Sequence, residues 1–134
     1  MKLLRYGPIG QEKPALLDDQ GRMRDLSDNL NDLRDGNLDP ERLAALSNID
    51  TETLPVVEGT VRIGTPIARV GKIIAIGLNY VDHAAEFGMD IPEEPVIFTK
   101  AVTALNGPND PVILPKDATK GDWDVELAIV IGRK

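Results

Sequence analysis

The chain has 134 residues, 42% of them hydrophobic and 28% charged, a composition typical of a globular chain with one core. Its 15 Lys and Arg residues against 22 Asp and Glu give a net charge of −7, which opposes nonspecific binding to nucleic acid or to an anionic membrane. The absence of cysteine and the single histidine exclude disulfides, thiolate metal sites, a cysteine nucleophile and a multi-histidine zinc site within the chain.

Membrane and export signals are also missing from the sequence. No apolar run approaches the roughly 20 residues of a membrane-spanning helix. The first residues, Met1 to Gly7, are broken too early by polar residues and glycine to form a signal peptide. We therefore expect a cytoplasmic protein that does not associate with membranes.

The first sixty residues predict a small α+β domain. Residues 2–6 favour a strand, and residues 15–26 favour a hairpin in which Gly21 takes a positive φ. A helix is expected to begin at Pro40 with Asp39 as its N-cap. We expect this domain, residues 1–60, to pack on the main domain or on a dimer partner.

Residues 61–134 predict a mainly β domain. Short apolar segments are separated by loops rich in glycine and proline, and little helical periodicity follows position 70. The expected strands are residues 72–77, 96–99, 112–114 and 125–131. The whole chain is therefore assigned to the α+β class with a high share of strand.

The last of these segments alternates with a period of two. Asp124 and Glu126 begin one face, and the other face, which we expect in the core, consists of Val125, Leu127, Ile129 and Ile131. The two carboxylates lie roughly 7 Å apart at Cα, because alternate residues of a strand share a side. They either bind a hard cation such as Mg²⁺, Mn²⁺ or Ca²⁺, or form the solvated face of an edge strand.

The only histidine follows the strand predicted at residues 72–77. Glu86 comes three residues after His83, so on one helical turn the two side chains share a face. A carboxylate there can orient the imidazole and raise its basicity, which is what a general base needs. A His–Glu pair on an ordinary surface is the alternative.

Three segments in this order resemble the fumarylacetoacetate hydrolase family: residues 76–86, 95–100 and 122–132. The resemblance implies a β-barrel-type catalytic domain, incomplete in this chain, which would be the N-terminal half of a bacterial-type member. It also implies a homodimer and a divalent cation, Mg²⁺ above Mn²⁺ or Ca²⁺, held by three carboxylates. Two of these carry over onto Asp124 and Glu126, with Asp124 in place of the usual Glu. The third would lie beyond Lys134.

The resemblance further implies a metal-dependent hydrolase that cleaves a C–C bond of a 2,4-dioxo acid and yields a pyruvate-type enolate. His83, oriented by Glu86, would activate the water, and the cation would act as a Lewis acid. Lys100 would bind the charge of the 2-oxo or 2,4-dioxo acid substrate, or is an ordinary surface lysine. The same residues suit isomerases, hydratases, decarboxylases and lyases of the family, including a ureidoglycolate lyase-like activity. A non-catalytic module that binds a cation is a further alternative.

Overall fold

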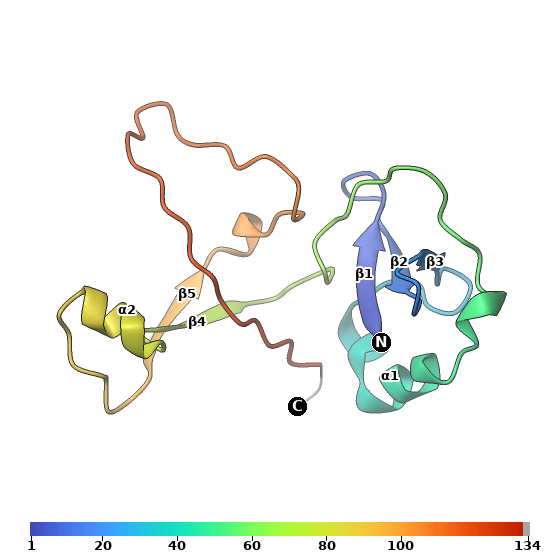
Figure 1. The fold of residues 1–134 in the computed structure, drawn as a ribbon, viewed down its shortest axis with the longest axis horizontal. Coiled ribbons are helices and arrows are strands. Elements are labelled where there is room, and N and C mark those ends of the chain that lie inside the picture. Colours follow the sequence, from blue (N-terminus) through green and yellow to red (C-terminus); the bar gives the residue numbers. More distant parts are fainter. Residues whose placement is uncertain (133–134) are drawn as a thin grey trace. The chain divides into compact units, whose positions relative to one another are not determined.

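The computed structural model of the chain describes residues 1–132 (Figure 1). They form two compact units: Met1–Arg69 together with the chain from Asn106 onward, and Val70–Leu105. Each unit contains a small antiparallel sheet and short helices, so the predicted mixture of α and β structure is confirmed. No helix within residues 1–132 has both the length and the apolar surface to cross a membrane. The domain boundary at residue 60 and the β-barrel stay predictions.

The first unit is built on a three-stranded antiparallel sheet. Its strands β1 (Lys2–Tyr6), β2 (Lys13–Leu17) and β3 (Met23–Asp25) lie side by side in chain order. The hairpin between β2 and β3 confirms the prediction, and Gly21 has a φ of 76° there. A side chain at this angle would crowd the backbone, which is why glycine is suited to the position.

Short helices follow this sheet in the chain. The 3-10 helices η1 (Asp35–Leu38) and η2 (Thr51–Thr53) flank α1 (Pro40–Ser47). The predicted start of α1 is confirmed, although the side chain of Asp39 makes no capping hydrogen bond. One cluster of buried leucines forms the core, drawn from β2, α1 and the loops between the elements: Leu16, Leu26, Leu30, Leu33, Leu46 and Leu54.

A buried carboxylate ties the β2–β3 hairpin together. Asp18 accepts hydrogen bonds from the backbone N–H groups of Gln20 and Arg22, at 3.0 and 2.8 Å. Its other oxygen accepts from Nε of Arg22 at 2.8 Å and from Nε of Arg24 at 2.9 Å. Burial alone raises the pKa of Asp18, but the hydrogen bonds from Arg24 and Arg22 outweigh it and hold that pKa far below its ordinary value.

We expect acid to destabilise this unit through Asp18. A carboxylate with a lowered folded-state pKa contributes stability above its unfolded pKa, about 3.9 for Asp, and that stability is lost as the pH falls below this value. The urea midpoint of unfolding should therefore drop more steeply below about pH 4 in the native chain than in Asp18→Asn. The control is Asp19→Asn, which changes an exposed carboxylate in the same turn and should follow the native profile. If the urea midpoint fell equally with pH in the native chain and in both variants, Asp18 would not be the source of the acid sensitivity.

The second unit is a hairpin that carries a short helix. Strand β4 (Ile73–Gly77) pairs antiparallel with β5 (Val96–Lys100), and α2 (Val81–Glu86) lies between them in the chain, with the 3-10 helix η3 (Val102–Ala104) after β5. The two strands and the helical turn agree with the sequence prediction. Every residue of β5 is exposed, and β4 alternates between exposed and half-buried positions.

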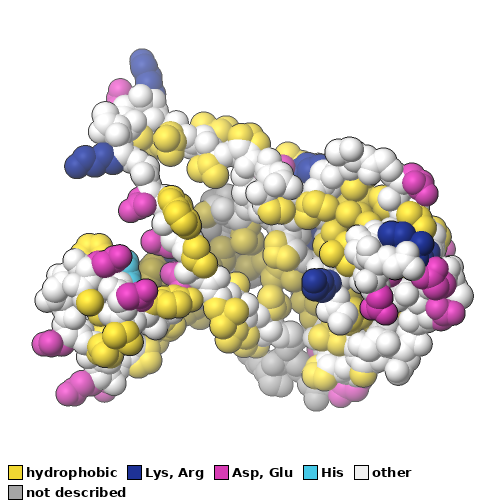
Figure 2. Space-filling view, in the orientation of Figure 1, with side chains coloured by type: hydrophobic (Ala, Val, Ile, Leu, Met, Phe, Trp, Pro, Cys, Tyr) yellow, Lys and Arg dark blue, Asp and Glu magenta, His cyan; other side chains and the backbone are white. Residues whose placement is uncertain are grey.

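The two strands predicted in the last segment are wrong for this structure. Residues 106–132 form no strand, so the predicted strands at 112–114 and 125–131 are absent. The face expected in the core is exposed at Val125, Leu127 and Ile129, by 75, 81 and 78%. Hydrophobic side chains are accordingly visible at the surface in Figure 2. Alternation sets which residues share a face, but a strand also needs a neighbouring strand for its backbone hydrogen bonds. Residues 106–132 have no such neighbour within the described part of the chain.

Candidate functional site

The histidine and the glutamate predicted as a catalytic pair lie together on α2. Nδ1 of His83 is 3.6 Å from Oε2 of Glu86, and both side chains are substantially exposed. The rings of His83 and Phe87 pack edge to face, with 5.0 Å between their centres. The imidazole therefore has an acidic neighbour at one nitrogen and an aromatic neighbour against its ring, while Nε2 has no partner among residues 1–132.

A strained turn delivers the chain from β4 into α2. Leu78 follows the last residue of β4 and has a φ of 51°, a conformation that is costly for a residue with a branched side chain. Such strain persists only where the surrounding structure imposes it, and it is frequent at functional sites. No sequence pattern marks this feature, because leucine has no preference for this backbone region.

Lys100 lies at the other end of the β4–β5 hairpin. It is opposite Ile73 at the start of β4, whereas Gly77, which leads to the turn and α2, is opposite Val96. The two ends are four residue steps apart, about 13 Å at the usual rise per residue of a strand. Nζ of Lys100 sits 5.9 Å from the centre of the Phe98 ring, a cation–π contact. The structure thus gives Lys100 an aromatic support on the hairpin and does not bring it to the turn before α2.

The acidic pair lies in the first unit, in the extended segment after Asn106. Asp124 and Glu126 are both exposed, and neither makes a hydrogen bond or an ion pair within residues 1–132. No cluster of three or more potential ligands, counting His, Cys, Asp and Glu, occurs in the part of the chain that is described. The pair belongs to the first unit, and His83 belongs to the second.

Strongly perturbed ionisable groups lie elsewhere, in the ion pairs of the first unit. Besides Asp18, Tyr6 has its pKa raised to about 12 by burial and by Asp25, whose Oδ2 accepts a hydrogen bond from the phenol at 2.6 Å. Each of these groups already has a protein partner that accounts for its shift. Their shifts therefore reflect structural hydrogen bonding rather than a second catalytic site.

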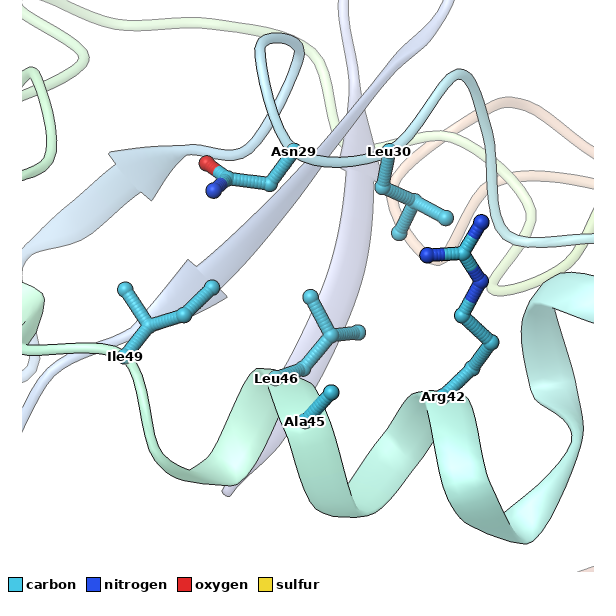
Figure 3. A pocket seen from close by; sticks show the side chains of 6 residues that line it. All are labelled: Asn29, Leu30, Arg42, Ala45, Leu46 and Ile49. Carbon is cyan, nitrogen blue, oxygen red and sulfur yellow. The ribbon is translucent and has the colours of Figure 1, made fainter.

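A hollow of about 240 Å³ opens between α1 and the preceding loop (Figure 3). Leu46 and Ile49 form its apolar side, and Arg42 reaches over it from the first turns of α1. Leu30, Asn29 and Ala45 complete the lining. None of the predicted site residues lines this hollow, and its lining contains no His, Cys, Asp or Glu, so the candidate site lies elsewhere.

Residues 72–134 match the model of the fumarylacetoacetate (FAA) hydrolase C-terminal domain. This region of the chain belongs to the fumarylacetoacetate hydrolase family. All five predicted site residues of this family member fall inside the matched region: His83, Glu86, Lys100, Asp124 and Glu126.

Similar proteins occur in Burkholderia. The family member is 57% identical over 132 residues to a protein of B. ambifaria (strain MC40-6) named "Putative hydrolase", covering 98% of this chain and 47% of the relative. Similarity is nearly as high to proteins with the same kind of name in B. orbicola (strain MC0-3), 56% over 134 residues, and B. multivorans (strain ATCC 17616 / 249), 56% over 132 residues. These alignments cover 100 and 98% of this chain and 48 and 47% of the relatives. The chain spans about half the length of the curated relatives that it matches.

Proposed function

We propose that this chain contributes the general base and two metal ligands to a divalent-metal-dependent hydrolase that cleaves a C–C bond of a 2,4-dioxo acid. The products would be a carboxylic acid and a pyruvate-type 2-oxo acid. The observation that carries the proposal is the pairing of His83 with Glu86 on α2, at 3.6 Å, inside the region matched to the family. A cytoplasmic homodimer remains the expected form of the protein.

The His83–Glu86 pair suits the removal of a proton from water. Glu86 lies on the Nδ1 side of the imidazole, so Nε2 is the nitrogen left to accept the proton. When His83 takes up that proton, the carboxylate of Glu86 stabilises the resulting positive charge. Hydrolysis needs such a base because water itself is a weak nucleophile, whereas simple decarboxylation does not. The pair therefore favours the hydrolase over the other reactions of the family.

The atoms of the proposed reaction balance with water as the only co-reactant. The water oxygen bonds to the distal carbonyl carbon while His83 takes one of its protons. The C–C bond then breaks, and its electron pair goes to the pyruvate-type fragment as an enolate. The proton held by His83 finally passes to the carbon of that enolate, which gives a methyl group and restores the neutral base.

Asp124 and Glu126 have the chemistry that a hard divalent cation requires. Both offer carboxylate oxygens, the ligands that Mg²⁺ prefers, and both are exposed without a competing partner within residues 1–132. A bound ion would supply positive charge for the substrate carboxylate and for the enolate that forms. Residues 1–132 contain no group of three potential ligands that could hold a metal ion, so water and groups outside these residues would complete the coordination.

Metal removal tests the proposal on the protein as it is naturally produced. A chelator should abolish the loss of ultraviolet absorbance of a 2,4-dioxo acid, and added Mg²⁺ should restore it. Glu126→Gln should weaken Mg²⁺ binding in calorimetry by at least about tenfold, because even the loss of a supporting group around a metal site costs 10–100-fold.

Asp117→Asn is the matched control, since it removes an exposed carboxylate from the same segment and should bind Mg²⁺ normally. Turnover that survives complete removal of divalent ions would refute metal-dependent hydrolysis. Release of carbon dioxide and pyruvate from an oxaloacetate-type acid would favour the decarboxylase. Ion uptake without any turnover of dioxo acids would favour the non-catalytic module.

A further inference from the structure

One side chain joins the start of the segment that carries Asp124 and Glu126 to the sheet of the first unit. Arg62 donates from Nε to Oδ1 of Asp110 at 2.8 Å and from Nη2 to Oδ2 at 2.6 Å, a two-bond pairing. Its remaining nitrogen, Nη1, donates to Oε1 of Glu12 at 3.0 Å and to the carbonyl of Gly7 at 3.1 Å. Arg62 therefore connects Asp110 to the turn between β1 and β2.

Glu12 holds the Arg62 guanidinium on the side away from Asp110. Its side chain is only 8% exposed, and its second oxygen accepts hydrogen bonds from Arg5 at 3.3 Å and from the N–H of Gly10 at 3.1 Å. Arg5 pairs in turn with both oxygens of Asp32, at 2.7 and 3.2 Å. The guanidinium of Arg62 is thus held by a chain of alternating charges anchored in β1. An arginine is required here, because only its planar fork can bind Asp110 twice and Glu12 at the same time.

Close backbone contacts at both ends of the segment support its attachment to the first unit. Gly107 is buried, its N–H donates to Oδ2 of Asp110 at 3.0 Å, and a Cβ at this position would overlap the carbonyl oxygen of Ile63. Gly132, at the far end of the segment, packs as closely against the backbone of Leu38. Between these two points the segment has no strand partner and exposes nearly all of its side chains.

We propose that Arg62 is a positioning residue that fixes the segment bearing Asp124 and Glu126 on the first unit, so that the two carboxylates are held ready for their cation. This rests on the proposed function, since the cation is part of it. Because Asp110 lies fourteen residues before Asp124, Arg62 acts through the backbone and not by contact with the ion. The Arg62 guanidinium also holds the pKa of Asp110 below its ordinary range, so the attachment persists at neutral pH.

A double-mutant cycle on ion binding tests the proposal in the protein as it is naturally produced. Arg62→Gln and Asp110→Asn should each weaken Mn²⁺ binding in calorimetry by about tenfold, at the low end of the losses seen for groups that support metal ligands. The double variant should bind no more weakly than either single variant, since both remove the same attachment. Arg62→Lys should recover part of the affinity, because it keeps the charge but not the fork.

Arg24→Gln is the control for stability. Arg24 is buried and paired with Asp18 and Glu52, away from the segment, so this variant should unfold at lower urea but bind Mn²⁺ normally. Native affinity in Arg62→Gln would overturn the positioning role, as would single losses that multiply in the double variant.

A second measurement separates this inference from the proposed function. The 134 residues contain no cysteine, so Gln20→Cys and Asn109→Cys introduce labelling sites on the hairpin tip and on the segment, both exposed. The distance distribution between spin labels at these positions should broaden in Arg62→Gln and not in Arg24→Gln. If the native protein takes up no divalent ion, the proposed function fails, while the broadening still shows that Arg62 anchors the segment. An unchanged distribution overturns the inference even in an active enzyme.

Discussion

Replacing His83 with alanine is expected to lower kcat for a 2,4-dioxo acid by about 10²–10⁴-fold, the usual contribution of a positioned general base. The expectation follows from the imidazole on α2, whose Nδ1 faces Glu86 while Nε2 is left to take a proton from water. Glu86→Gln should cost less, since it removes the charge that stabilises protonated His83 but leaves the base. The measurement is the loss of ultraviolet absorbance of the dioxo acid at saturating Mg²⁺.

The controls separate chemistry from folding. Glu93→Gln changes an exposed carboxylate of the same unit and should leave kcat unaltered. Circular dichroism should be the same for all variants, because His83 and Glu86 are exposed and support no core. If His83→Ala turns over at the native rate, His83 is not the base, and the choice of hydrolysis over decarboxylation loses its support.

Local features of the fold were predictable because neighbouring residues determine them. Gly21 marked the hairpin turn, Pro40 marked the first residue of α1, and the His83–Glu86 spacing placed two side chains on one face of a turn. Each of these signals acts within a few residues, where backbone sterics and helical periodicity decide the outcome. The spacing therefore predicted that His83 and Glu86 lie together, and their catalytic role is a proposal.

Features that depend on distant partners were not predictable. The pairing of Arg62 with Asp110 joins positions 48 residues apart, and Arg24 meets Glu52 across 28. A charged residue has no local pattern that identifies such a partner. Leu78 is similar, since its positive φ is imposed by what surrounds the turn rather than by the residue itself.

In the segment around Asp124, a local pattern predicted a strand that the structure does not contain. Its alternation of apolar and polar residues is strong, yet residues 106–132 form no strand and expose both faces. The sequence specified which residues share a side, and it contains no information on which strand would lie beside them. The acidic pair was consequently predicted by spacing alone, and its place in a metal site remains a proposal.

Leu16→Ala is expected to destabilise the chain by about 2–5 kcal/mol, a large part of the 5–15 kcal/mol by which a typical domain is stable. Leu16 is 2% exposed and lies in the cluster of buried leucines between β2 and α1, so its loss leaves a cavity as well as removing apolar contacts. Unfolding in urea should be followed by circular dichroism, because Trp123 is 79% exposed and its fluorescence will respond weakly to unfolding.

Ile113→Ala is the matched comparison, and its result bears on the segment that carries the acidic pair. Ile113 is 88% exposed, so truncating it should change stability by no more than about 0.5 kcal/mol, as for most surface substitutions. A cost as large as that of Leu16→Ala would contradict the exposure found here. Such a cost would mean that residues 112–114 are covered in solution. The strand expected from their sequence would then pair with a neighbouring strand that residues 1–132 do not provide.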